Sequence, residues 1–196
     1  MQIAAELEMA ARLAASRLRE GGVIAYPTEA VWGLGADPGN SEACRRLLQI
    51  KSRPMEKGMI LVAASQAQLA SLLTPLTDAQ RERLTSGWAA QATHGPLTFL
   101  VPDPLDQVPL WVKGSHSGVA LRVSDHFAVR ALCEAFGGPV VSTSANTAGR
   151  PPARSRHEVE TMFGARLDHV MPGSVGDASQ PSRIVDLLTG HEVRPG

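Results

Sequence analysis

Residues 23–35, VIAYPTEAVWGLG, constrain the fold of this chain more than any other stretch. The apolar run VIAY is typical of a buried strand, and Pro27 then removes a hydrogen bond of the strand ladder, so the chain should leave the sheet at Thr28. Open α/β sheets bind their ligands at the carboxyl ends of strands, and Gly33 and Gly35 would let the backbone approach a bound group. We therefore expect a ligand-binding loop here. The alternative is an ordinary strand-to-helix turn.

Strand-like apolar runs alternate with helical periodicity along the rest of the chain. Helices are predicted at residues 5–20, 41–51, 65–73, 77–84, 125–137 and 155–164, and strands at 23–26, 59–64, 97–101, 119–123, 139–141, 184–187 and 191–193. Loops are predicted at 33–39 and at 86–94, which has no clear period. The expected helix caps are Ser41, Asp125 and the capping boxes Thr77–Gln80 and Ser155–Glu158. This order predicts an α/β fold with a mixed sheet, built as one domain over residues 1–196.

Composition excludes several classes of protein. The chain has 196 residues, 43% of them hydrophobic, which suffices for one substantial core. Its 19 basic and 19 acidic residues give zero net charge, whereas a protein that mainly coats nucleic acid is usually strongly basic. Cys44 and Cys133 lie in apolar helical patterns, which argues against a disulfide framework. We expect no signal peptide or membrane span, and a cytoplasmic location.

A local cationic patch follows the helix predicted at 41–51. The segment KSRPMEKG places Lys51, Arg53 and Lys57 close together against one acid, Glu56. Arg53 precedes a proline and is therefore held extended, and an arginine with a lysine suits phosphate binding. The alternative is a solvated helix end, because the helix dipole favours cations there.

A second polar cluster follows the apolar strand predicted at 139–141. The sequence STSAN, residues 142–146, offers three hydroxyls and a carboxamide, with Gly149 and Arg150 just beyond. Hydroxyls and free backbone N–H groups at a strand end can hold phosphate or carboxylate oxygens. The alternative is a Ser/Thr-rich turn that satisfies its own backbone.

Two further arginines and several missing motifs narrow the chemistry. Arg122 interrupts an apolar strand, so it lies either on the solvent face or inside against an anion. Arg194 could fold back as another anion ligand, or belong to a frayed tail. The six histidines lack HxxxH or HxH spacing, so we expect no metal held by protein ligands. No P-loop, Rossmann fingerprint or GxSxG motif is present.

Seven landmarks occur in a recognisable order: YPTEAVWGLG, KSRP with KG, GPLTFLVP, LRVSDH, STSANTAGRPP, PSRIVDLLTG and VRPG. Together they resemble the YrdC/Sua5/TsaC family of threonylcarbamoyl-adenylate synthases, and most closely its short bacterial form. The resemblance spans nearly the whole chain. It implies a twisted mixed sheet with helices on both faces and a large, positively charged cleft.

The resemblance also implies a reaction. L-Threonine, bicarbonate and ATP would give threonylcarbamoyl-adenylate and pyrophosphate, for the N6-threonylcarbamoyl modification of adenosine 37 in tRNA (t6A37). ATP would bring Mg²⁺ as its own partner, and a tRNA threonylcarbamoyl-transferase complex would receive the adenylate. Positioning and electrostatics can drive such a reaction, so no nucleophilic side chain is required.

The resemblance assigns site residues by position. Lys51 and Arg53 would hold ATP phosphates and act electrostatically in catalysis, and the rest of the ATP site would be Ser142, Ser144, Asn146, Arg150 and Arg194. Threonine would be bound by Thr28, Arg122 and Ser182, with Arg122 pairing its carboxylate. Glu29 would hold a neighbouring cation or cap the loop rather than act in catalysis.

Two rival functions remain open at this stage. One is a protein that binds double-stranded RNA, as in ribosome maturation, without turnover; the zero net charge and the 4% aromatic content weigh against it. The other is formation of carbamoyl-adenylate, as in the related domain of hydrogenase-maturation proteins. That domain normally belongs to a longer chain.

Overall fold

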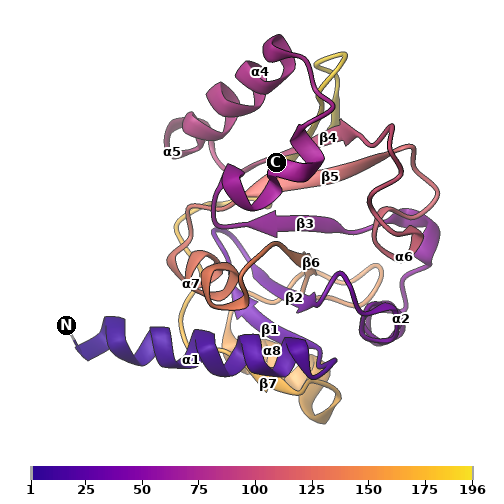
Figure 1. Ribbon diagram of the computed structural model, residues 1–196. Coiled ribbons are helices and arrows are strands. Elements are labelled where there is room, and N and C mark those ends of the chain that lie inside the picture. The colour runs from indigo at the N-terminus through magenta and orange to yellow at the C-terminus, as the bar shows by residue number, and fades with distance from the viewer. Residues whose placement is uncertain (1, 196) are drawn as a thin grey trace.

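One mixed sheet of nine strands organises the computed structural model, which describes residues 2–195 (Figure 1). The strand order is β7-β1-β2-β6-β3-β5-β4-β8-β9. The pairs β1–β7, β3–β5 and β4–β8 are parallel and the remaining pairs are antiparallel, so the predicted mixed sheet is confirmed. The strands are β1 (Ile24–Pro27), β2 (Trp32–Ala36), β3 (Ile60–Ala63), β4 (Leu97–Pro102), β5 (Gly118–Val123), β6 (Val140–Ser144), β7 (His169–Val170), β8 (Arg183–Asp186) and β9 (Glu192–Arg194).

Helices cover both faces of the sheet, as expected (Figure 1). The α-helices are α1 (Gln2–Arg19), α2 (Ser41–Lys51), α3 (Ala70–Leu73), α4 (Asp78–Ala89), α5 (Gln91–His94), α6 (Leu110–Lys113), α7 (Phe127–Phe136) and α8 (Arg156–Phe163). Short 3₁₀ turns are η1 (Met55–Lys57), η2 (Gln66–Leu69) and η3 (Gly164–Arg166). Buried residues of α1 and α7 share one core cluster, and those of α2, α4, α6 and α8 belong to another. No helix within residues 2–195 is long and apolar enough to cross a membrane.

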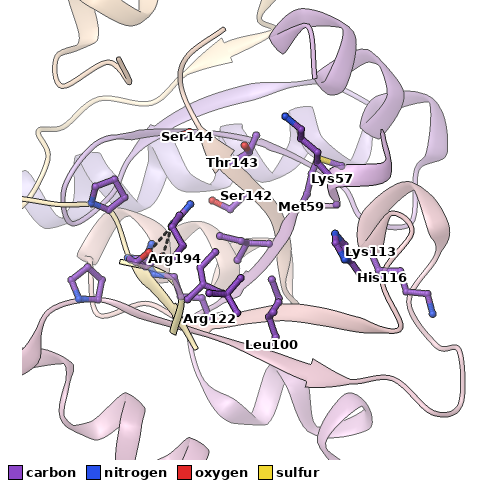
Figure 2. Close-up of a pocket in the computed structure, with 18 of the residues that line it drawn as sticks. Lys57, Met59, Leu100, Lys113, His116, Arg122, Ser142, Thr143, Ser144 and Arg194 are labelled. Carbon is purple, nitrogen blue, oxygen red and sulfur yellow. Dashed lines mark hydrogen bonds between the residues drawn. The ribbon is translucent and has the colours of Figure 1, made fainter. Parts of the chain in front are cut away.

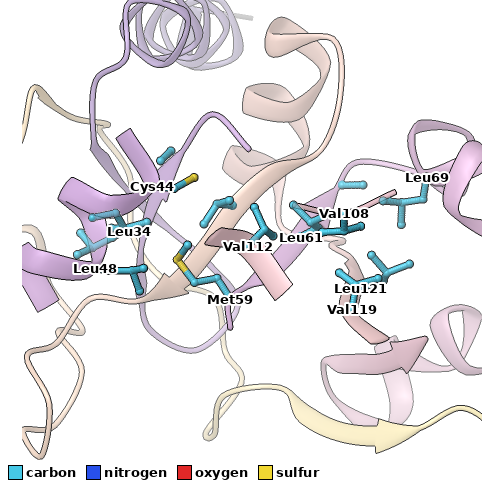
Figure 3. Close-up of a cluster of buried hydrophobic side chains, with 14 of the residues drawn as sticks. Leu34, Cys44, Leu48, Met59, Leu61, Leu69, Val108, Val112, Val119 and Leu121 are labelled. Carbon is cyan, nitrogen blue, oxygen red and sulfur yellow. The ribbon is translucent and has the colours of Figure 1, made fainter. Parts of the chain in front are cut away.

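Side chains along the central strands point alternately to the two faces of the sheet and so contribute to both hydrophobic cores. In β3, Leu61 packs in the cluster that contains α2 and α6, while Val62 packs in the cluster with α1 and α7. Figure 3 shows part of the cluster that contains α2 and α6, to which β2 contributes Leu34, α6 contributes Val112 and β5 contributes Leu121. Fully burying an aliphatic side chain of this kind contributes about 1.5–3 kcal/mol.

Several local predictions are confirmed. The helix predicted at 41–51 ends at Lys51, where Ser52 adopts a left-handed conformation with φ 51°. Thr77 and Gln80 form the predicted capping box at the start of α4. The predicted C-terminal hairpin is β8 paired antiparallel with β9. Cys44 and Cys133 are buried free thiols.

The prediction of a loop at residues 86–94 is wrong, because α4 continues to Ala89 and α5 follows. Trp88 is buried and stacks edge-on against Phe99, with ring centroids 5.8 Å apart. A Cβ on Gly87 would approach the Phe99 ring to 2.6 Å. Gly87 is therefore needed for this close packing, and its presence weakens the helical pattern in the sequence.

The predicted loop at 33–39 is also wrong in its first half, since β2 extends to Ala36 and pairs with both β1 and β6. Its glycines serve packing within the sheet. A Cβ on Gly35 would lie 2.8 Å from Cε1 of Tyr26, a fully buried side chain on β1. Glycine has a low strand propensity, so the sequence WGLGA does not look like a strand, although its glycines make room for the Tyr26 ring.

The remaining errors concern helix starts and short elements. Asn40, not Ser41, caps α2, and α7 begins after His126 with no side-chain cap, so Asp125 does not cap it. Ser155 accepts from the Glu158 N–H as expected, but the Glu158 carboxylate accepts from the Arg154 N–H instead of closing a capping box. The short elements β7 and α6 were not expected. The organisation of residues 1–196 as one domain stays a prediction. Its first and last residues, Met1 and Gly196, lie outside the described residues.

Candidate functional site

A cleft of about 580 Å³ opens on the sheet face that also carries α1 and α7 (Figure 2). Its floor is one row of residues in register across five strands: Ser142 on β6, Ile60 on β3, Ala120 on β5, Leu100 on β4 and Asp186 on β8. The three central positions are apolar. The sheet therefore provides a flat apolar floor, with polar groups at its edges.

Positive charge dominates the walls of this cleft. The described lining residues include one acidic residue, Asp186, and five lysines and arginines: Arg53, Lys57, Lys113, Arg122 and Arg194. Figure 2 shows Arg122 and Arg194 near one end, and Lys57 and Lys113 at the other. Such a concentration of cations between low-dielectric walls attracts anions.

Arg122 enters the cleft from β5 and is held by the loop after β1. Its guanidinium donates to Glu29 Oε2, and Glu29 Oε1 accepts from Ser124 Oγ at 2.8 Å. Burial alone would raise the pKa of Glu29, but Arg122 and Ser124 together lower it below its ordinary value. Of the two alternatives left open for each residue by the sequence analysis, Arg122 lies inside against an anion, and Glu29 holds a neighbouring cation.

Thr28 follows β1 and lines the same part of the cleft. Its hydroxyl donates to the Val31 carbonyl at 2.7 Å, which leaves oxygen lone pairs to accept from a ligand. The backbone of residues 176–178 closes over this turn, because Gly176 donates to the Thr28 carbonyl and Ala178 to that of Glu29.

Ser182 and Arg194 form one unit at the β8–β9 side. Arg194 donates to the carbonyl and hydroxyl oxygens of Ser182, and the Ser182 hydroxyl lies 2.8 Å from that of Thr98. Burial, with the like charges of Arg122 and Arg53, lowers the pKa of Arg194. Three guanidinium groups therefore share the cleft at mutual electrostatic cost, which an anionic ligand would relieve.

Arg53 is positioned by the end of α2. The left-handed Ser52 turns the chain out of the helix, and Arg53 then donates to the carbonyls of Gly58 and Lys57, with an Nη2–O distance of 2.8 Å to Gly58. Burial lowers its pKa. These bonds fix the guanidinium at the cleft wall and leave Nη1 available to a ligand.

Lys51 lies behind the wall rather than in it. Its Nζ donates to the Ser144 carbonyl, to the Asn146 carbonyl at 2.8 Å and to Asn146 Oδ1 at 3.1 Å. Burial, with the neighbouring charge of Arg53, lowers its pKa to about 7. Asn146 and the exposed Arg150 likewise do not line the cleft.

The structure thus brings most of the predicted residues together. Seven of the ten line the cleft: Thr28, Arg53, Arg122, Ser142, Ser144, Ser182 and Arg194. The sequence analysis missed Lys113, whose ammonium is held by Asp103 at 3.0 Å and by Asp106. It also missed His116, and it assigned no role to Thr143, although it had singled out the STSAN segment that contains this residue. No local motif marks Lys113 or His116, which the segment from α6 onward carries to the cleft.

The fold and cleft together define an α/β protein with a cationic cleft suited to small anionic ligands. The chain belongs to the Sua5/YciO/YrdC family, because the family model Sua5_yciO_yrdC, described as "Telomere recombination", matches residues 16–196. A protein of Marinobacter nauticus named threonylcarbamoyl-AMP synthase is 55% identical over 182 residues, which are 93% of each chain.

Solved structures support the same assignment. The structure of P. abyssi Sua5 complexed with L-threonine has a TM-score of 0.81 and 31% identity, and the match covers 91% of this chain and 51% of that longer one. E. coli YciO has a TM-score of 0.78 at 22% identity, covering 96% of this chain and 91% of its own, which supports the fold alone.

Proposed function

We propose that this chain is a threonylcarbamoyl-AMP synthase that acts in the t6A modification of tRNA. It converts L-threonine, bicarbonate and ATP to L-threonylcarbamoyl-adenylate and pyrophosphate, and is thus a nucleotidyltransferase. The observation that carries this conclusion is the 55% identity to a threonylcarbamoyl-AMP synthase across 93% of both chains. The cationic cleft suits the reaction, because every substrate carries negative charge.

Threonine is proposed to bind at the Arg122 end of the cleft. Arg122 can pair the carboxylate, since its guanidinium is fixed by Glu29 and still faces the cleft. Thr28 and Ser182 line the same cleft and present oxygen atoms to it. P. abyssi Sua5, 31% identical to this chain, has a structure complexed with L-threonine, which supports threonine as the ligand.

ATP is proposed to lie across the floor of the cleft. The apolar positions Ile60, Ala120 and Leu100 offer a surface for the base, and the flanking cations and hydroxyls offer phosphate ligands. We assign the phosphates to Arg53, Arg194, Ser142 and Ser144, with Asn146 and Arg150 on the adjoining loop. Mg²⁺ would enter with the triphosphate and neutralise part of its charge.

Catalysis on this proposal depends on positioning and charge. The threonine amine condenses with bicarbonate to a carbamate and releases water. A carbamate oxygen then attacks the α-phosphorus of ATP; an oxygen–phosphorus bond forms, and the bond from the α-phosphorus to the bridging oxygen of pyrophosphate breaks. Arg53 and Arg194 would stabilise the negative charge that develops on the leaving pyrophosphate. The three fixed guanidinium groups need little reorganisation at that moment.

The product is a labile mixed anhydride, so it must be used quickly. We propose that a tRNA threonylcarbamoyl-transferase complex receives it in the cytoplasm. Two rival functions are direct RNA binding without turnover and the formation of carbamoyl-adenylate without threonine.

The test is to mix the protein with ATP, Mg²⁺ and bicarbonate, and to measure pyrophosphate with each amino acid in turn. We expect release that depends on L-threonine. Release that does not depend on the amino acid would refute the proposed reaction, and RNA binding that weakens with salt, without ATP turnover, would favour the RNA-binding function.

A matched pair of variants ties this activity to the cleft. Arg122→Met should raise the KM for threonine at least about tenfold, a loss of roughly 1.4 kcal/mol in binding. Arg156→Met removes an equal charge from an exposed pair with Glu160 on α8 and should leave turnover unchanged. Equal effects of the two variants would remove Arg122 from the threonine site.

A further inference from the structure

The side chain of Lys51 is buried at the end of α2 and is 3% exposed. Its ammonium group meets three oxygen atoms: the carbonyls of Ser144 and Asn146, and Oδ1 of Asn146. An ammonium group has three N–H donors and no acceptor. All three N–H donors of Lys51 therefore bond to residues at the end of β6 and just after it.

That segment, residues 144–150, is hereafter called the 144–150 loop, and its internal bonds depend on the same groups. The Ser144 hydroxyl donates to Asn146 Oδ1 at 2.7 Å, and Asn146 Nδ2 donates to the Arg150 carbonyl at 2.7 Å. The Ala148 N–H donates back to the Lys51 carbonyl at 3.1 Å. Lys51 therefore contacts the loop through both its side chain and its backbone.

The cleft lies on the other side of this arrangement. Ser142, Thr143 and Ser144 line it, whereas Lys51 and Asn146 do not. For Lys51 to reach a phosphate oxygen, it would have to give up at least one bond to the loop. A buried carbonyl that loses its donor is left with its desolvation cost unpaid, so the exchange is unfavourable.

We propose that Lys51 is a positioning residue, which holds the 144–150 loop so that Ser142 to Ser144 face the nucleotide, and does not itself touch the phosphates. This rests on the proposed function for the identity of the ligand as ATP. It differs from the role that the resemblance assigns to Lys51, which is direct contact with ATP.

The surroundings of the amine support this role. Burial, then Arg53, lowers the pKa of Lys51 to about 7, and no carboxylate among the described residues offsets them. The site therefore does little to stabilise the positive charge. The site uses the N–H donors of Lys51 instead, and a neutral amine or a primary amide keeps two such donors.

The test compares two neutral replacements of nearly equal size. Lys51→Gln keeps two N–H donors for the loop carbonyls, whereas Lys51→Met keeps none, and both remove the charge. We expect Lys51→Met to weaken ATP binding in calorimetry about tenfold and Lys51→Gln less than about threefold, since one lost bond of this kind is worth roughly 1–2 kcal/mol. The KM for threonine should change little in either variant.

Hydrogen exchange in the ligand-free protein supplies the second measurement. Backbone amides of residues 145–150 should exchange faster in Lys51→Met than in the wild type, and Lys51→Gln should restore most of the protection. Lys57 gives a matched control, because it is an exposed lysine that lines the cleft. Its Gln and Met variants should weaken ATP binding equally, since no hydrogen bond joins the Lys57 ammonium to the described residues and only its charge can act.

Two results would overturn the proposal. One is an equal loss of ATP affinity in Lys51→Gln and Lys51→Met, which would indicate that the charge itself acts on the phosphates. The other is unchanged exchange of the 144–150 loop in Lys51→Met. Neither measurement requires turnover, so a wild-type protein that binds ATP but releases no threonine-dependent pyrophosphate would refute the proposed function while the Lys51 comparison still stands.

Discussion

Glu29→Gln tests how the cleft holds its carboxylate-binding arginine. The change keeps the size of the side chain but removes the negative charge opposite Arg122. The Arg122 and Glu29 side chains are 11% and 17% exposed, so little water screens their ion pair. Removing one partner of a fully buried pair costs about 3–5 kcal/mol. Because this pair borders an open cleft, we expect about 2 kcal/mol, nearer the value for a hydrogen bond to a charged group.

That loss should appear in two assays. For a chain of this size each kcal/mol lowers Tm by about 2–4 °C, so Glu29→Gln should lower Tm by roughly 4–8 °C in calorimetry. The KM for threonine should rise about tenfold, because Arg122 loses its fixed orientation, while the KM for ATP should change less than about threefold. Glu160→Gln breaks only an exposed pair and should change neither quantity measurably.

The pH dependence gives an independent check with a defined sign. The pKa of Glu29 lies below its ordinary value of 4.5 in the folded protein. A carboxyl whose pKa is depressed by folding stabilises the fold above its unfolded pKa and loses that contribution as the pH falls through the folded pKa. The difference in unfolding free energy between wild type and Glu29→Gln should therefore shrink below a pH of about 4.5. A constant difference from pH 7 to pH 3, or an unchanged KM for threonine, would refute this account of Glu29.

Two further predictions concern packing and capping. Gly35→Ala should cost about 1–3 kcal/mol of stability by overpacking, because its Cβ would lie 2.8 Å from the Tyr26 ring. Gly138→Ala is its control, since no atom lies within 4 Å of that Cβ, and equal Tm values for the two variants would contradict the packing argument. Thr77→Ala should lower the free energy of unfolding in urea by about 1 kcal/mol, because it removes the capping box of α4. Ser65→Ala, at a position that makes no side-chain cap, should leave the urea midpoint unchanged, and a matching loss there would count against the cap.

The elements that sequence predicts well are those whose local pattern and tertiary surroundings agree. The helix at 41–51 combines apolar periodicity with a clear stop, and it ends at Lys51 as expected. The segment 86–94 fails because its helical conformation depends on contacts with distant segments, such as the edge-on contact of Trp88 with Phe99, which Gly87 makes possible. Such a contact joins two segments and leaves no period in either.

The residues of the candidate site likewise differ in how well the sequence predicts their positions. The sequence allows two environments for Arg122, the solvent face or a buried site beside an anion, and only the structure shows that it is buried beside Glu29. Lys51 was expected in the phosphate site because the resemblance assigns it there and because it belongs to the cationic segment KSRPMEKG. Its side chain instead points to the 144–150 loop. Residue type indicates what a group can bind, but the direction of the side chain depends on the fold.

The strand order has a consequence for how long the protein survives. The contacts between Lys51 and Ser144, and between Glu29 and Arg122, each join groups 93 positions apart in the chain. Contacts this distant form only after large loops have closed, so the cleft should assemble late in folding. An unfolded or partly folded chain then has no substrate site, and bound substrate withdraws molecules from the population that proteases can cut. At a hundredfold excess over its Kd, a ligand adds about 2.7 kcal/mol to stability. Substrate supply would thus regulate the abundance of this protein as well as its rate.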